Sequence, residues 1–316
     1  MFYGSLTMGL SAENKDAAKV KFRMVALDLD GTLLQSNHKL SDETCEYLRY
    51  LDQKGFTIII ATGRAACTVD EHIAKLNFPH PLPVVCSNGA RGLMCSVQAD
   101  QRVSYEQIFY KPVPEKTAGA VIQTAKDLGY VSQYYVGEHV YADPRKPEHF
   151  KLTEQYRELT GSDTIYISDD FEAAMKKGLP SKQLVLFQND QQDYVIESFE
   201  KTLNNEDFLI DGKAPNVVRG SLGWFLEILH PQVNKGGGLK CMCNHLGIPL
   251  SNVVAFGDGD NDLEFIKMAG WGVAMKNARD ILRAVADEVI IFTNDEEGVV
   301  KTLQRLENNG NLTFTT

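Results

Sequence analysis

Long apolar runs are absent from the sequence. The longest, such as residues 56–61 and 253–256, fall far short of the roughly 20 residues needed to cross a bilayer. Residues 1–22 also lack the basic, apolar and small-residue order of a secretory signal. We therefore predict a cytoplasmic protein without a membrane span, in which residues 1–22 form an N-terminal extension.

Cysteine and histidine show no pattern typical of a disulfide scaffold or a zinc site. The 6 cysteines are scattered without a C-x-x-C pair, and the 7 histidines show no spacing such as H-E-x-x-H. Reduced thiols in the cytoplasm are the expected state.

The sequence contains fewer basic residues than acidic ones. There are 32 Lys and Arg residues against 42 Asp and Glu, which gives a formal net charge of -10. Because nucleic acids and anionic membrane surfaces are polyanions, this balance argues against both as partners. A small metabolite, bound with the help of a cation, is the expected ligand. The sequence leaves open whether the protein is a monomer or a small homo-oligomer.

What the sequence does contain is a series of short apolar runs, each followed by a polar cluster. Helical stretches separate the runs, which is the pattern of a parallel sheet covered by helices. We predict a doubly wound, Rossmann-like α/β core. Ligands bind beyond the carboxyl ends of such strands, so one cleft can gather all the clusters. The clusters are Asp28-Leu29-Asp30-Gly31-Thr32, Thr62-Gly63-Arg64, Ser87-Asn88-Gly89-Ala90 and Gly257-Asp258-Gly259-Asp260-Asn261-Asp262.

The chain is also long enough for an inserted domain. Its 316 residues exceed one ordinary domain. Between about residues 92 and 231, aromatic and charged residues mix and no polar cluster repeats. We therefore predict a core made of residues 23–91 and 232–316, interrupted by an α/β domain at 92–231.

The acidic residues of the first and last clusters point to a metal ion. Asp258, Asn261 and Asp262 add oxygen ligands to those of Asp28 and Asp30. Carboxylates that converge without a cation repel one another and raise each other's pKa values. A hard divalent cation is therefore implied, and magnesium suits few carboxylates, water and a phosphate oxygen.

The first, second and last of these clusters, together with Lys235 before Gly236-Gly237-Gly238, resemble the four ordered motifs of the haloacid dehalogenase superfamily. The insertion and residues 87–90 are similar to its Cof-like sugar-phosphatase branch with a type-two cap. The resemblance implies a magnesium-dependent phosphatase that acts on a small phosphorylated metabolite through an aspartyl-phosphate. A sugar phosphate is the first candidate substrate, followed by pyridoxal phosphate or a flavin precursor.

The resemblance also assigns roles to the first motif. A carboxylate can form an acyl-phosphate, so Asp28 is the candidate nucleophile. Asp30 is the candidate general acid and base, a role that calls for a pKa moved toward neutrality. Asp28 and Asp258 are expected to bind the metal through their carboxylates, and Asp30 through its backbone carbonyl.

Four residues are expected to bind the phosphate. They are Thr62, Gly63, Lys235 and Asn261, which supply a hydroxyl, a backbone amide, an ammonium and an amide group. Asp262 is expected to support this shell by orienting Lys235 or a water molecule.

Several alternatives stay open. Asn88 either lines the cleft or forms a tight turn, and Arg64 either contacts the substrate or forms a salt bridge at a helix start. A phosphomutase would use the same two aspartates and return the phosphoryl group to the substrate. A non-catalytic metabolite-binding or regulatory protein is a third possibility.

Overall fold

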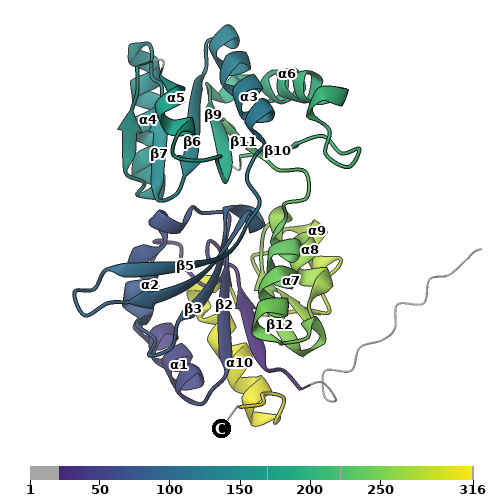
Figure 1. The fold of residues 1–316 in the computed structure, drawn as a ribbon. Helices are drawn as coiled ribbons and strands as arrows, with labels where there is room; N and C mark the ends of the chain where they lie inside the picture. Colours follow the sequence, from purple (N-terminus) through teal and green to yellow (C-terminus); the bar gives the residue numbers. More distant parts are fainter. Residues whose placement is uncertain (1–20, 169, 221, 315–316) are drawn as a thin grey trace, which may run out of the picture.

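The computed structural model describes residues 21–168, 170–220 and 222–314. The N-terminal extension expected at residues 1–22 lies outside these residues except for Lys21 and Phe22. Phe22 is fully buried and pairs with Leu312, so it belongs to the core and not to an extension. The described strands form two sheets, one below the other in Figure 1.

The larger sheet confirms the predicted α/β fold. Its order is β14-β13-β12-β1-β2-β3-β4-β5. All neighbours from β14 to β3 run parallel, whereas β4 and β5 are antiparallel. The strands are β1 (Met24–Leu27), β2 (Thr57–Ala61), β3 (Leu82–Cys86), β4 (Arg91–Val97), β5 (Val103–Tyr110), β12 (Val253–Gly257), β13 (Trp271–Ala274) and β14 (Glu288–Val289).

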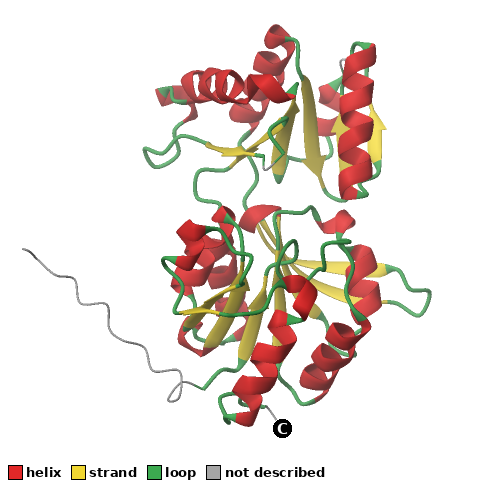
Figure 2. Ribbon diagram, turned by 180° about the vertical axis from the view of Figure 1, so that it is seen from behind, coloured by secondary structure: helices red, strands yellow, loops and turns green. Residues whose placement is uncertain are grey.

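Helices cover both faces of this sheet (Figures 1 and 2). Ser41 caps the first of them by accepting a hydrogen bond from the Thr44 amide at 2.9 Å, and Cys45, Leu48 and Leu51 bury its apolar face. The helices of this region are α1 (Asp42–Gln53), α2 (Asp70–Leu76), α7 (Lys235–Leu246), α8 (Leu263–Met268), α9 (Asp280–Arg283) and α10 (Gly298–Asn308).

The smaller sheet has the order β10-β11-β9-β6-β7-β8 and helices of its own. Segments 111–114 and 230–234 connect it to the larger sheet. Its strands are β6 (Val131–Val136), β7 (His139–Ala142), β8 (Thr164–Tyr166), β9 (Lys182–Leu186), β10 (Asn216–Arg219) and β11 (Phe225–Leu229). Its helices are α3 (Glu115–Leu128), α4 (Pro147–Thr160), α5 (Phe171–Met175) and α6 (Gln192–Leu203).

The structure differs from the sequence prediction at the start of the insertion. Strands β4 and β5 were expected in the domain at 92–231, but β4 pairs with β3 and extends the larger sheet. The prediction recognised core strands by the polar cluster that follows each of them. An antiparallel hairpin at the sheet edge carries no such cluster, so nothing in that pattern marked it.

No helix in the described part of the chain is both long and apolar enough to cross a membrane.

Candidate active site

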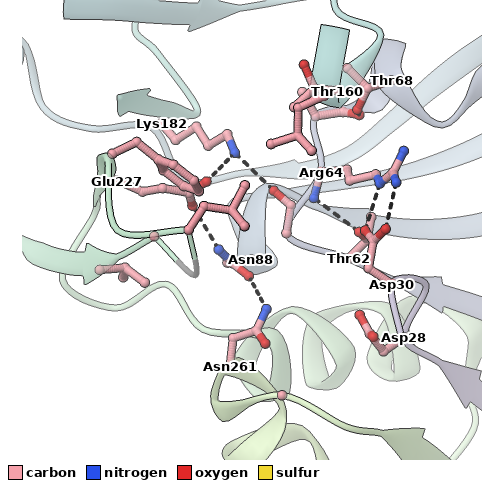
Figure 3. A pocket seen from close by; sticks show the side chains of 18 of the residues that line it. Asp28, Asp30, Thr62, Arg64, Thr68, Asn88, Thr160, Lys182, Glu227 and Asn261 are labelled. Carbon is pink, nitrogen blue, oxygen red and sulfur yellow. Dashed lines mark hydrogen bonds and ion pairs between the residues drawn. The ribbon is translucent and has the colours of Figure 1, made fainter. Parts of the chain in front are cut away.

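Three strands end side by side at one edge of the larger sheet. β1 lies between β12 and β2 and runs parallel to both. Asp28, Thr62 and Asp258, which follow these strands, therefore leave the sheet next to one another. Figure 3 shows Asp28 and Thr62 below a layer of side chains from the smaller sheet.

The loop after β1 passes very close to the loop after β12. Gly31 has a φ of +79°, and a Cβ atom there would lie 2.3 Å from Asp258 Oδ2. Only glycine combines this left-handed backbone with so close an approach. Thr32 Oγ1 donates a hydrogen bond to Asp258 Oδ1 at 3.0 Å, which fixes the carboxylate against the turn.

Three carboxylates gather around one buried ammonium group. Lys235 Nζ donates to Asp28 Oδ1 at 2.5 Å and to Asp262 Oδ1 at 2.7 Å. Oxygen atoms of Asp28, Asp258 and Asp262 all lie within 4.8 Å of one another. Lys235 is the first residue of α7, whose start is capped by the Asn234 side chain. One positive charge thus faces three acidic groups.

The electrostatics of this cluster favour a bound cation. Burial raises the pKa of Asp28 well above its usual value; Lys235 opposes the shift, while Asp262 and Asp258 add to it. Burial also raises the pKa of Asp258 to about 6, with Asp262 as the next cause. A divalent cation relieves this repulsion, and the all-oxygen donor set is the one magnesium prefers.

Asp262 supports the cluster and has little capacity left for a metal. Its Oδ1 accepts from Lys235, and its Oδ2 accepts from the amides of Asp258 and Gly259 at 3.0 and 2.9 Å. Both oxygens are thus engaged in holding neighbouring groups. The carboxylates of Asp28 and Asp258 have more capacity left to bind a cation, and Asp262 has the contact with Lys235 that a supporting residue requires.

Asp30 lies apart from the three clustered carboxylates. Arg64 Nε and Nη2 donate to its two oxygens at 2.7 and 2.6 Å, and His38 Nδ1 lies 3.4 Å from Asp30 Oδ1. Burial works to raise the pKa of Asp30, but the hydrogen bonds and charge of Arg64 outweigh it and lower the pKa. The expected shift toward neutrality is therefore wrong for the protein without substrate. Arg64 forms its salt bridge with Asp30.

Thr62 and Gly63 follow β2 at the centre of the site. Thr62 Oγ1 accepts a hydrogen bond from the Arg64 amide at 3.1 Å, so its hydroxyl hydrogen stays available to an acceptor. The Thr62 amide is bonded to the Val85 carbonyl and cannot also donate to a phosphate. The hydroxyl of Thr62 is therefore the donor that this residue can offer.

The haloacid dehalogenase-like hydrolase family matches residues 25–303, nearly nine-tenths of the chain. This chain belongs to that family. The superfamily membership predicted from the four motifs is thereby confirmed.

Two bacterial relatives are named as phosphatases. A phosphatase of Bacillus subtilis is 27% identical, covering 90% of this chain and 99% of its own. The 5-amino-6-(5-phospho-D-ribitylamino)uracil phosphatase of the same organism is also 27% identical, with 89% of this chain and 96% of its own covered. A solved subclass IIB sugar phosphatase of the superfamily shares the fold, with a TM-score of 0.69, 22% identity, and coverage of 90% and 99%.

A cavity of about 580 Å³ lies between the two sheets of this hydrolase, directly over Asp28. Its roof includes Tyr135, Tyr156 and Phe225 from the smaller sheet and its helices. Lys235 and Asp262 are fully buried and do not line it, whereas its floor carries Asp28, Asp30, Thr62, Gly63, Asp258 and Asn261. Tyr135 on β6 lines this cavity, whereas Tyr134, His139, Tyr141 and Arg145 of the same region do not.

Asn88 both forms a turn and lines the cavity, so the two alternatives are not exclusive. Its φ is +55°, and it lies in a short turn of 3-10 helix (Ser87–Gly89) against α7. Asn261 Nδ2 donates to Asn88 Oδ1 at 2.9 Å, which joins the turn at residues 87–90 to the last motif (Figure 3). Asn261 thus lies across the cavity floor from Thr62 and Gly63.

Sequence reasoning missed two charged residues of the cavity, Lys182 and Glu227. They lie on β9 and β11, whose residues are all buried. For Glu227 the available signal was a single charge inside an apolar run, because a charge in a buried strand needs a specific partner. Lys182 stands between Ser181 and Gln183, before the run at 184–187, and carried no such signal.

Proposed function

We propose that this chain is a magnesium-dependent phosphatase that hydrolyses a small phosphorylated metabolite through an aspartyl-phosphate on Asp28. The observation that carries the proposal is the buried contact of Asp28 with Lys235, beside Asp258, at the floor of a cavity of about 580 Å³. The cavity is large enough for a metabolite and opens onto the carboxylate that would react.

Asp28 and Asp258 would hold the magnesium ion through their carboxylates, and Asp30 through its backbone carbonyl. The ion would offset the charge of these acids and of the transferring phosphoryl group. Lys235, with its pKa raised by Asp262 and Asp28 against the opposing effect of burial, stays an ammonium and balances part of the same charge.

In the first step, a carboxylate oxygen of Asp28 attacks phosphorus and the bond from phosphorus to the ester oxygen breaks. Lys235 holds Asp28 Oδ1, which leaves Oδ2 for the attack. Because Arg64 keeps Asp30 ionised in the protein without substrate, this step requires that Asp30 gain a proton when the substrate binds. That proton then passes to the leaving oxygen, so the product departs as a neutral alcohol. Thr62, Gly63, Lys235 and Asn261 hold the phosphoryl oxygens in place.

In the second step, the ionised Asp30 accepts a proton from water as the water oxygen attacks phosphorus. The bond between phosphorus and the Asp28 oxygen breaks, which releases inorganic phosphate and restores the carboxylate. The roof over the cavity limits access of other water, as closed lids do in enzymes of this type.

A sugar phosphate is the substrate class we propose first. Tyr135, Tyr156 and Phe225 line the cavity with apolar surface that suits the carbon skeleton of a sugar, and Glu227 and Asn88 are polar groups that line it too. The solved subclass IIB sugar phosphatase supports this choice. The ribitylaminouracil phosphatase of Bacillus subtilis supports a flavin precursor as the next candidate, with pyridoxal phosphate behind it.

We further propose that residues 92–231 act as a cap over the core, apart from the hairpin of β4 and β5. The enzyme would work in the cytoplasm as a monomer or a small homo-oligomer. The free state of all 6 cysteines supports a reducing compartment.

A screen of phosphorylated metabolites tests the function. Phosphate release should appear with magnesium and disappear with chelator, and Asp28→Asn should lower kcat by about 10³-fold or more with the fold intact. Asp260→Asn is the matched control, because Asp260 lies in the same region, is half exposed and pairs with Arg279. Near-normal hydrolysis by Asp28→Asn refutes the nucleophile, and a second sugar phosphate among the products would indicate a mutase instead.

A further inference from the structure

A buried ion pair at the cavity joins the smaller sheet to the larger one. Lys182 Nζ lies 2.6 Å from Glu227 Oε1, and the two side chains are only 3% and 10% exposed. The ring of Tyr135 covers the ammonium at 5.1 Å from its centroid. The pair comes from β9 and β11, which are neighbours in the smaller sheet.

Each member of the pair also contacts the larger sheet's loops. Lys182 Nζ donates to the Gly63 carbonyl at 3.1 Å, and Asn88 Nδ2 donates to Glu227 Oε2 at 3.0 Å. Asn88 in turn accepts from Asn261. The ion pair thus reaches two of the segments that are proposed to bind the phosphate, Thr62–Gly63 directly and Asn261 through one amide (Figure 3).

Besides bonding to each other, Lys182 and Glu227 each make a hydrogen bond to a loop of the larger sheet. Glu227 Oε1 accepts from Lys182 in the same sheet, and Glu227 Oε2 accepts from Asn88 in a loop of the larger sheet. Removing two charges from water opposes folding, and a buried pair often stabilises a protein no more than apolar residues of the same size. The arrangement therefore suits positioning better than stabilisation.

We propose that Lys182 and Glu227 are positioning residues that align Gly63 and Asn261 for a phosphate when the smaller sheet lies over the cavity. This inference rests on the proposed function. Contacts from the cap would then assemble the phosphate-binding groups, in addition to covering the substrate. A Cβ at Gly63 would lie 3.0 Å from Asn88 Oδ1, so these two segments lie close together.

The test variant is Lys182→Met/Glu227→Gln, which removes both charges at once and leaves neither buried and unpaired. Its control is Arg91→Met/Glu138→Gln. Arg91 Nη1 and Glu138 Oε1, whose side chains are 11% and 32% exposed, form an ion pair at 2.7 Å that joins β4 of the larger sheet to the turn between β6 and β7. Their described hydrogen bonds reach Gln107 and Gly137 and none of the phosphate-binding segments.

We expect the test variant to keep its fold but to lose about tenfold to a hundredfold in kcat/KM, since small misplacements of binding groups have effects of that size. Competitive inhibition by inorganic phosphate should weaken by a similar factor. The control should stay within about threefold of the original protein. Equal losses in both variants, or unchanged inhibition by phosphate in the test variant, would overturn the proposal.

Hydrogen exchange separates this inference from the proposed function, because it needs no turnover. The Ser87 and Asn88 amides donate to the Arg64 and Thr62 carbonyls, and these bonds hold the two loops together. Exchange at residues 87 and 88 should speed up in the test variant only. If the original protein hydrolyses no phosphate ester, the proposed function fails, while faster exchange would still support the positioning role and unchanged exchange would refute it.

Discussion

Arg64 donates two hydrogen bonds to the carboxylate of Asp30, from Nε to Oδ2 at 2.7 Å and from Nη2 to Oδ1 at 2.6 Å. Such paired contacts are among the strongest that a carboxylate makes. The Arg64 amide also donates to Thr62 Oγ1, so one residue ties the candidate general acid to the candidate phosphate-binding loop. This pairing keeps Asp30 ionised in the protein without substrate.

The pH dependence of catalysis should therefore respond to Arg64. A general acid acts in its protonated form, so kcat/KM falls as the pH rises through its pKa. Arg64→Met removes the group that lowers the pKa of Asp30, against the opposing effect of burial. We expect the descending limb of the pH profile to move to higher pH. Arg64→Lys keeps the charge and should move it less, whereas an unmoved limb in Arg64→Met would contradict the assignment of Asp30.

Lys235 should be as important for stability as for activity. It is 1% exposed and lies between Asp28 and Asp262, so Lys235→Met leaves two buried carboxylates without their partner. Breaking a buried ion pair in this way lowers the free energy of unfolding by about 3–5 kcal/mol. Urea denaturation of the metal-free protein measures the loss.

The control for this prediction lies on the same helix. Lys240 is exposed on α7, and Lys240→Met should change the free energy of unfolding by no more than about 0.5 kcal/mol. Similar stability in the two variants would show that the ammonium group of Lys235 does not hold the carboxylates together.

The sequence predicted the site best where polar residues directly follow the predicted strands. Asp28, Thr62 and Asp258 were expected at one edge because each follows an apolar run, and parallel pairing of β1 with β2 and β12 does bring them together. Lys235 was expected from its place at a glycine-rich helix start, where it meets Asp28 in space. Local sequence determines such positions because the strand register carries each residue to the same edge.

The same pattern of strands and polar clusters could not predict contacts between residues that lie far apart in the sequence. Lys182 and Glu227 are separated by 45 residues, and only the pairing of β9 with β11 makes them partners. The lowered pKa of Asp30 depends in the same way on Arg64, 34 residues away. Both contacts depend on which way two side chains point in the folded protein. Composition and sequence spacing do not determine that direction.

Magnesium should stabilise the protein more at neutral pH than at acidic pH. Burial raises the pKa of Asp258 to about 6 in the folded protein, above its value of 3.8 in the unfolded chain. Between these values the folded state binds the extra proton, so the contribution of Asp258 to stability falls as the pH rises through this range. Near pH 7 the ionised carboxylate is free to bind the metal, whereas at pH 5 protons compete.

The measurement is the increase in Tm on adding magnesium at pH 5.0 and at pH 7.5. We expect a clearly larger increase at pH 7.5, because binding to the folded state alone raises stability by mass action. Asp258→Asn should abolish most of the increase at both values. An equal increase at the two pH values would mean that the metal does not bind at Asp258.

Gly31 gives the sharpest steric test of the site. Gly31→Ala imposes a left-handed backbone on an L-residue, which costs about 1–2 kcal/mol. It also places a methyl group 2.3 Å from Asp258 Oδ2, so the carboxylate has to move. We expect weaker magnesium binding, by about tenfold or more, in addition to lost stability, since ligand geometry governs this ion. Calorimetry and thermal melting measure the two effects separately.

Gly247 is the matched control for Gly31, because it combines a similar backbone with open space. It ends α7 with a φ of +66°, and no atom lies within 4 Å of the Cβ that alanine would add. Gly247→Ala should therefore lower stability by about 1 kcal/mol through backbone strain and leave magnesium binding unchanged. Because the two variants share the strain and differ in the contact with Asp258, a selective loss of metal binding in Gly31→Ala isolates the position of that carboxylate. Equal metal binding in both variants would show that the site tolerates its displacement and that Asp258 is not a ligand.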